Sequence, residues 1–301
     1  MMIFQIESCV MKQNFLKSFH EIPSAAVFLS GSGSNAEILL KENAGPDAPF
    51  WRPSVLVTDR PETSRARELA AMSGLPLIEL DIRAFYRAEG MDRVTIATPE
   101  GMAVREKWTS LLRERLAPYH PDFGIFAGFV TLCNITKDFP CLNVHPGDLT
   151  VRENGRRIYA GLHLGPTEKA ILRGEKTIRS SVILAEGISA GAAEMDEGPV
   201  LGISDPVALD LHGMTREELH GIFRDRAGKA PSGRKNDALA RLAGENIDRL
   251  KANGDWKLFP RVIRDFARGF FSFDGPVLFY RDRPVSTVYY PDGRPPEPVF
   301  L

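Results

Sequence analysis

Cysteine is scarce in this sequence, and its three copies form no recognisable pattern. Cys9, Cys133 and Cys141 show no CxxC spacing, and the six histidines form no HExxH pattern. Neither a disulfide scaffold nor a zinc site is indicated, so no metal is predicted and a reducing, cytoplasmic location is expected.

Long apolar runs and an excess of one charge are also missing. Nowhere do eighteen apolar residues follow one another, and charges are scattered through residues 1–24, so neither a membrane span nor a signal peptide is predicted. We expect residues 1–24 to form an N-terminal extension. The formal net charge is -1, which provides no electrostatic reason to expect binding to nucleic acid or to an anionic membrane.

What the sequence does contain is an alternation of apolar runs and helical patterns. Between residues 25 and 207, strands are predicted at 25–30, 53–59, 75–80, 123–129, 141–144, 178–186 and 201–207. Amphipathic segments separate several of them. This alternation predicts an α/β, Rossmann-like, mostly parallel sheet with helices on both faces, and such sheets bind ligands at the carboxyl ends of their strands.

From residue 208 the character of the sequence changes. Helical patterns predominate, with Thr215 and Glu218 placed as a capping box at a helix start, and the stretch PVLFYRDRPVSTVYYPDG indicates a hairpin. We expect a domain over 25–207 and a mainly helical C-terminal extension over 208–301 with a terminal hairpin. The phenylalanines of this extension are expected in the core or at a homodimer interface; they are Phe266, Phe270, Phe271 and Phe273.

A glycine-rich loop follows the first predicted strand. Residues 31–36 fit G-x-G-x-x-A and Asp59 ends the second strand, which is close to a dinucleotide-binding pattern with Asp59 on a ribose. The loop also fits a phosphate cradle made of backbone N–H groups and a helix N-terminus, with side-chain donors from Ser32, Ser34 and Asn35. A tight turn that binds nothing is the third interpretation, and the loop alone leaves all three open.

Polar side chains follow the fifth predicted strand in the stretch NVHPGDL. Asn143 and His145 are one strand pleat apart, so their side chains lie on the same side of the chain. Asp196 belongs to the turn-forming segment MDEGPV, and an acid near an imidazole favours the imidazolium and fixes its orientation. An amide donor, an imidazole and a carboxylate around one point suit acyl transfer, which needs an oxyanion held and a proton moved.

Taken together, these motifs resemble those of folate-dependent formyltransferases, most of all the branch that formylates glycinamide ribonucleotide. The resemblance covers roughly residues 25–207. The stretches that carry it are FLSGSGSNAEIL (28–39), PSVLVTDRPETSRARELAAMSGLPL (53–77), APYHPDFGIFAGFVTLC (117–133), LNVHPGDL (142–149) and MDEGPVL (195–201). The combination of N-x-H-P with D-x-G-P is more specific than the glycine loop.

The resemblance implies transfer of a formyl group from 10-formyltetrahydrofolate to a small, phosphorylated amine in purine biosynthesis, with glycinamide ribonucleotide as the default. Asn143 and protonated His145 would stabilise the tetrahedral oxyanion, and Asp196 would orient His145 or a water that relays protons. The residues implied to bind the phosphate are Gly31, Ser32, Gly33, Ser34 and Asn35. The folate would lie against the 191–198 loop and the 127–133 loop, whose implied folate-binding residues are Phe129, Val130, Thr131 and Leu132.

Two departures from the family pattern lie on the amine side. GDLT replaces the usual S-L-L-P after N-x-H-P, and a polar piece, RENGRR, is added before YAGLH, whose His163 corresponds to a family histidine. Arg156 and Arg157 of this piece could clamp an anion, but a solvated loop is the more common role of such a pair. The resemblance therefore transfers the folate chemistry better than the identity of the amine.

Three alternatives remain open. The acceptor could be another amine, such as an amino sugar nucleotide or methionyl-tRNA, although a mainly helical, barely basic tail argues against the tRNA enzyme. A nicotinamide-dependent oxidoreductase would use the G-x-G-x-x-A loop, but it leaves Asn143, His145 and Asp196 unexplained. A non-catalytic sensor of folate or nucleotide is compatible with the altered GDLT segment.

Overall fold

The structure, a computed structural model, describes residues 13–16, 22–45, 49–189, 192–193, 195–226 and 236–301. Cys9 and most of the predicted N-terminal extension lie outside these residues. Cys133 and Cys141 are buried and unpaired. Among the described helices, none has the length and apolar character that crossing a bilayer requires.

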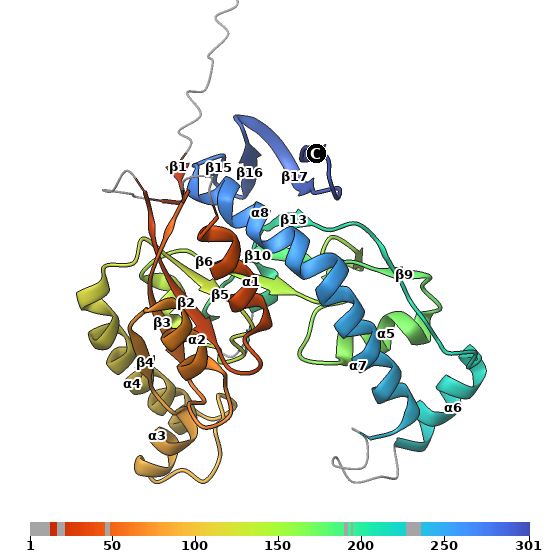
Figure 1. The fold of residues 1–301 in the computed structure, drawn as a ribbon. Coiled ribbons are helices and arrows are strands. Elements are labelled where there is room, and N and C mark those ends of the chain that lie inside the picture. The colour runs from red at the N-terminus through yellow and green to blue at the C-terminus, as the bar shows by residue number, and fades with distance from the viewer. Residues whose placement is uncertain (1–12, 17–21, 46–48, 190–191, 194, 227–235) are drawn as a thin grey trace, which may run out of the picture.

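One sheet organises the chain (Figure 1). Its central strands are parallel and follow the order β4 (Leu77–Glu79), β3 (Arg52–Thr58), β2 (Ser24–Leu29), β5 (Phe123–Phe126) and β6 (Cys141–His145). The first of these strands in the chain, β2, therefore lies in the middle, and the direction of winding reverses between β2 and β5. A crevice forms at the carboxyl ends of the strands at such a reversal, and ligands bind there.

Beyond β6 the sheet continues, mostly with antiparallel pairs. The strands are β10 (Ser181–Leu184), β13 (Val200–Ile203), β17 (Arg283–Tyr289), β16 (Val277–Tyr280), β15 (Phe271–Asp274) and β1 (Gln13–Asn14), with β18 (Glu297–Phe300) also on β17. Among the strands of this half that the structure describes, only β13 and β17 pair in parallel, with Ile203 opposite Tyr289. The predicted terminal hairpin is β16–β17, and it belongs to the same sheet as the strands of residues 25–207.

The described residues also form three short two-stranded sheets that are separate from the main sheet. They are β7 (Arg152–Glu153) with β8 (Arg156–Arg157), β9 (Thr177–Ile178) with β14 (Val207–Ala208), and β11 (Ile188–Ser189) with β12 (Ala192–Ala193). The β7–β8 hairpin is the RENGRR piece that the sequence adds before YAGLH.

Helices cover both faces of the sheet, which confirms the predicted α/β fold. One face carries α1 (Ser34–Asn43), α2 (Ala66–Ser73) and α8 (Trp256–Ala267), and the other carries α3 (Ile82–Ala88) and α4 (Pro99–Leu116). In β2, Val27 packs with the first group of helices and Phe28 with the second. A strand covered on both faces needs apolar residues at every position, which explains the unbroken run in β2.

The C-terminal region is mainly helical, as predicted. α5 (Gly165–Arg173), α6 (Arg216–Asp225) and α7 (Ala238–Leu250) share a small apolar cluster, and α6 begins with the predicted capping box of Thr215 and Glu218. The buried Arg226 guanidinium joins the three helices through Glu168 at 2.8 Å and Asp237 at 2.7 Å. These two carboxylates hold the pKa of Arg226 well above its usual range.

α7 and α8 are joined by one π-helical turn, Lys251–Asp255. Figure 1 shows them as one long, almost continuous helix whose upper part, α8, lies over α1. Gly254 permits the close approach of this turn to the sheet, because a Cβ there would lie 2.5 Å from the Ser180 hydroxyl oxygen. Insertions of this kind often mark functional sites.

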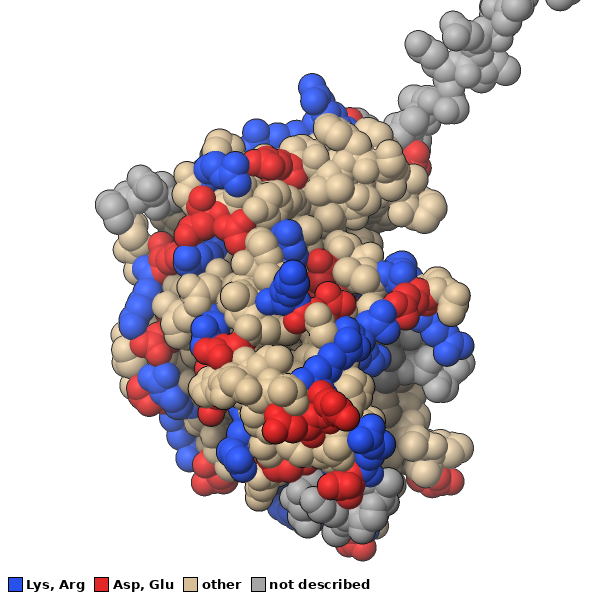
Figure 2. Space-filling model, turned by 90° about the vertical axis from the view of Figure 1, so that its right-hand side faces the viewer, with Lys and Arg blue, Asp and Glu red and all other residues tan. Residues whose placement is uncertain are grey.

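Three short 3₁₀ helices complete the secondary structure that the described residues show: η1 (Ala117–Tyr119), η2 (Asn134–Lys137) and η3 (Met195–Glu197). α3 and α5 are helices that the sequence patterns do not predict. On the face drawn in Figure 2, positive and negative side chains are interspersed without an extended field of one sign. Phe266 and Phe271 are each 1% exposed and belong to the core, and the homodimer stays a prediction.

Candidate active site

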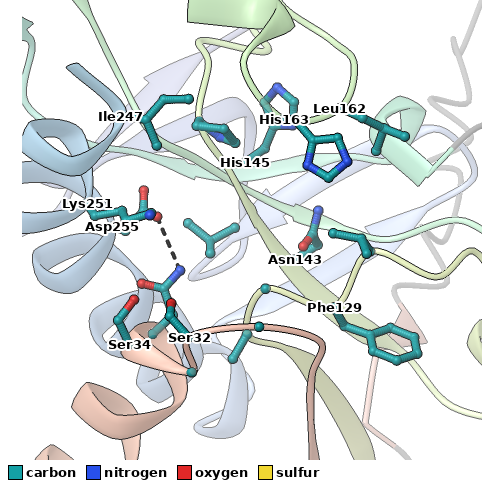
Figure 3. A pocket seen from close by; sticks show the side chains of 18 of the residues that line it. Ser32, Ser34, Phe129, Asn143, His145, Leu162, His163, Ile247, Lys251 and Asp255 are labelled. Atoms are coloured by element: carbon teal, nitrogen blue, oxygen red, sulfur yellow. Dashed lines mark hydrogen bonds between the residues drawn. The ribbon is translucent and has the colours of Figure 1, made fainter. Parts of the chain in front are cut away.

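A cavity of about 370 Å³ opens at the crevice beside the carboxyl ends of β2, β5 and β6 (Figure 3). Its walls come from residues 31–35, 127–130, 143–146 and 161–164, together with Asp196, Ile247, Lys251 and Asp255. Six separate segments of the chain therefore meet at the place where a sheet of this order binds ligands.

The end of β6 supplies an amide and an imidazole to this cavity. Asn143 is 7% exposed and His145 is 3% exposed. Figure 3 shows the Asn143 amide in the cavity, and no group among the described residues is found hydrogen-bonded to it. A buried amide without a protein partner is suited to donate to an oxygen of a bound ligand.

His145 is held from two sides. Its Nε2 lies 2.7 Å from the carbonyl oxygen of Tyr159, and because a carbonyl only accepts, this nitrogen carries the proton. Its Nδ1 lies 3.5 Å from Asp196 Oδ1, which is longer than a strong hydrogen bond but within ion-pair distance. Both ring nitrogens thus face acceptor oxygens, which fix the orientation of the ring.

Asp196, in η3, is fixed by contacts to its side chain and its backbone. Its Oδ2 accepts the Gly161 N–H at 3.1 Å, and the Arg157 guanidinium donates to the carbonyl oxygens of Asp196 and, at 2.8 Å, Gly198. Only glycine fits at position 198, because a Cβ there would lie 1.8 Å from the Leu184 carbonyl oxygen. The structure therefore brings Asn143, His145 and Asp196 together, as the motifs predict.

The expectation that the Arg156–Arg157 pair is solvated is wrong for Arg157. Arg156 is exposed, whereas Arg157 is partly buried against the loop that carries Asp196. The physical reason is strand geometry, because neighbouring residues of β8 point to opposite sides of the hairpin. Partial burial, and secondarily the charge of Arg152, lower the pKa of Arg157.

Glycine is found at positions 31 and 33 of the loop after β2 for two different physical reasons. Gly33 has φ 66°, and a Cβ there would lie 2.7 Å from Leu69 Cδ1, so the fold itself requires it. A Cβ on Gly31 would meet nothing within 4 Å, and Gly31 lines the cavity. The absence of a side chain at Gly31 leaves room for a ligand beside the N-terminus of α1, where residues 32–35 also line the wall.

The predicted folate loop divides into two parts. Phe129 and Val130 line the cavity, the Phe129 ring itself being packed in the core, whereas Thr131 and Leu132 do not line it. The Thr131 hydroxyl donates to a carboxylate oxygen of Asp59, which is 0% exposed. Asp59 is therefore not accessible to a ribose, and the dinucleotide interpretation loses its acidic residue. The 191–198 loop lies partly outside the described residues.

The π-helical turn adds a carboxylate that sequence reasoning missed. Asp255 is 4% exposed and lies across the cavity from Asn143 (Figure 3). It accepts hydrogen bonds from the Ser180 hydroxyl and, at 3.2 Å, from Asn35 Nδ2. Burial raises the pKa of Asp255. The only sequence signal is the Asn-Gly-Asp interruption of a helical pattern, which does not reveal where the carboxylate points.

Two further residues of the cavity wall are notable, Lys251 for its charge and His163 for its backbone conformation. Lys251, at the start of the π-helical turn, lines the cavity and pairs with Asp248 at 3.0 Å. His163 lines the cavity with a left-handed φ of 56°, a conformation that is uncommon outside glycine and often found at functional sites. In the described part of the chain, no group of three metal-ligating side chains is found.

No model of a protein family matches the sequence, and no curated protein sequence matches it. Solved structures of the same α/β class do resemble this one. Glycinamide ribonucleotide transformylase 1 from Symbiobacterium toebii is 21% identical, with TM-score 0.55 over 86% of this chain and 94% of that one. Phosphoribosylglycinamide formyltransferase from Coxiella burnetii is 17% identical, with TM-score 0.58 over 90% and 100%. The enzyme of that name from Anaplasma phagocytophilum is 17% identical, with TM-score 0.56 over 89% and 98%.

These similarities show the fold of the chain. Since 90% of this chain is covered in the second comparison, the similarity in fold extends past residues 25–207 into the C-terminal region. The sequence resemblance, in contrast, ends near residue 207. Most of residues 208–301 therefore belongs to the shared architecture, even though no motif in them is recognisable.

Proposed function

We propose that the protein transfers a formyl group from 10-formyltetrahydrofolate to a small phosphorylated amine, with glycinamide ribonucleotide as the default acceptor. The observation that carries this proposal is the meeting of Asn143, His145 and Asp196 in one cavity that also contains the glycine loop. The similarity in fold to two enzymes called phosphoribosylglycinamide formyltransferase supports it. Such a protein would act in one-carbon metabolism and purine biosynthesis.

The reaction requires one bond to form, one to break and one proton to move. The amine nitrogen attacks the formyl carbon, the bond from that carbon to the folate nitrogen breaks, and a proton passes from the amine to the folate nitrogen. Asn143 Nδ2 would donate to the oxyanion of the tetrahedral intermediate. Because His145 Nε2 is engaged by Tyr159, we assign the proton transfer to the Nδ1 side, where Asp196 Oδ1 lies.

The two substrates would enter from different walls. The amine's phosphate would lie at residues 31–35, where Gly31 leaves space and the N-terminus of α1 favours an anion. The formyl donor would lie along residues 127–130, where Gly128 has φ 84° and open space beside it. Phe129 and Val130 are retained as folate contacts, and Thr131 and Leu132 are assigned to the support of this loop.

A turnover assay tests the proposal. The protein is incubated with 10-formyltetrahydrofolate and a panel of phosphorylated and nucleotide-linked amines, and the folate absorbance is followed. We expect formyl transfer to a phosphorylated amine. Folate binding without transfer to any amine would replace the proposal with a sensor, and tight binding of a nicotinamide dinucleotide in calorimetry would replace it with a redox enzyme.

Removal of the proposed oxyanion donor gives the second test. We expect Asn143→Ala to lower kcat by about 10²–10³-fold, as loss of one oxyanion donor does in other enzymes. Folate binding, measured by calorimetry, should change little because the amide acts on the tetrahedral intermediate. An unchanged kcat would remove Asn143 from the chemistry.

A further inference from the structure

One five-residue segment contacts both members of the His145–Asp196 pair. The carbonyl oxygen of Tyr159 accepts from His145 Nε2 at 2.7 Å, and the N–H of Gly161 donates to Asp196 Oδ2 at 3.1 Å. Arg157 begins the same segment and donates to the backbone of the Asp196 loop. Residues 157–161 thus touch the imidazole, the carboxylate and the loop that carries the carboxylate.

Arg157 is the group that ties this segment to the loop. Its guanidinium contacts two carbonyl oxygens of the loop, those of Asp196 and Gly198, and planar guanidinium donors hold two acceptors in one geometry. Arg157 does not line the cavity, and these hydrogen bonds go to backbone oxygens of the loop. Its effect on the pair is therefore indirect, through the position of the backbone.

The residue after Pro146 makes the arrangement possible. A Cβ at Gly147 would lie 2.7 Å from the Tyr159 carbonyl oxygen and 3.1 Å from His145 Nε2. Gly147 is not free to move away, because its carbonyl oxygen accepts from the Ser181 hydroxyl at 2.8 Å. Any larger residue at this position would separate Tyr159 from the imidazole.

We propose that residues 157–161 are a brace that sets the geometry of the His145–Asp196 pair, and that Arg157 is a positioning residue within it. The added piece RENGRR supplies Arg157, and the replacement of the family's serine by Gly147 makes room for the Tyr159 carbonyl. The two departures from the family pattern are then one structural change. The catalytic part of this inference rests on the proposed formyl transfer, whereas the geometric part does not.

Two readouts on matched variants test the brace. In the turnover assay, we expect Arg157→Ala to lower kcat about 100-fold, the scale that small misplacement of reacting groups produces, with little change in the KM for folate. Arg157→Lys should recover part of this loss, since an ammonium donates to carbonyls with less fixed geometry. Arg156→Ala is the control, because Arg156 is exposed on the same strand.

The second readout does not depend on activity. In ¹⁵N-edited NMR spectra, the His145 Nε2–H should be protected from exchange, because it is buried and bonded to the Tyr159 carbonyl; a His145→Asn spectrum identifies the signal. We expect the signal to persist in Arg156→Ala and to be lost in Arg157→Ala. We expect Gly147→Ala to lose the signal as well, because its added Cβ disturbs the same His145–Tyr159 contact. This variant provides the test if Arg157→Ala does not fold.

The outcomes separate the two proposals. If the parent protein transfers no formyl group while the NMR signal responds to Arg157 and Gly147, the proposed function is wrong and the brace stands. If the signal persists in Gly147→Ala and in every folded Arg157 variant, or if Arg156→Ala loses it equally, the brace is wrong whatever the activity.

Discussion

Asn143 and Asp255 face the same cavity, but their polar atoms are partnered differently. The Asn143 amide is found bonded to no described group, whereas both oxygens of Asp255 accept from protein donors, Ser180 and Asn35. An amide without a partner is ready for a ligand, while a satisfied buried carboxylate mainly shapes the wall. Burial alone therefore does not distinguish a side chain that is open to a ligand from one that supports the wall.

The raised pKa of Asp255 predicts a pH-dependent stability. A carboxyl whose pKa is raised by folding contributes stability below its unfolded value, and this contribution is lost as the pH rises through the raised value. An asparagine side chain at this position has nearly the same size as aspartate and does not titrate. We expect Asp255→Asn to melt above the parent at about pH 8 and this advantage to shrink toward about pH 4, measured by calorimetry. A difference independent of pH would contradict the assignment.

At the scale of elements, the π-helical turn decides how the C-terminal helices reach the cavity. It lies between α7 and α8 and brings Lys251 and Asp255 to the wall opposite Asn143. Sequence patterns predict the two helices but not the turn, because a π turn changes the helical repeat by a single residue. In the same way, short elements such as α3 and β7–β8 depend on contacts rather than on periodicity.

Two glycines within this long helical stretch provide a matched prediction. A Cβ on Gly254 would lie 2.5 Å from the Ser180 hydroxyl oxygen, whereas a Cβ on Gly244, in α7, would meet nothing within 4 Å. We expect Gly254→Ala to lower the free energy of unfolding by about 1–3 kcal/mol through overpacking. Gly244→Ala should raise it by about 0.4–1 kcal/mol, because alanine restricts the unfolded chain. Urea unfolding measures both, and equal effects would show that the turn does not need a glycine.

At the scale of the whole molecule, the two halves of the sequence share one core. Phe259, Val262 and Phe266 of α8 belong to the same buried cluster as Val27 and Leu142 of the parallel strands. β17 also pairs with β13. The division at residue 207 that the sequence suggests stays a prediction, and the shared core argues that each part needs the other for stability.

A truncated chain tests this dependence. We expect a fragment of residues 25–207 to lack a cooperative unfolding transition, because removal of α8 exposes the apolar face of β10 and β13, on which it packs, to water. Circular dichroism during urea titration, with dye binding to report exposed apolar surface, measures this outcome. A cooperative transition in the fragment would establish residues 25–207 as an independent domain.

The sequence by itself determined the α/β alternation and the motif of Asn143, His145 and Asp196. Strands covered on both faces must be apolar throughout, and the proposed acyl transfer demands particular side chains, so both requirements appear as local patterns. Only the tertiary structure decided that Arg157 holds the Asp196 loop and that Asp255 meets Asn35. These contacts join residues 39 and 220 positions apart, and no local period or turn preference records a contact that exists only once distant segments have packed.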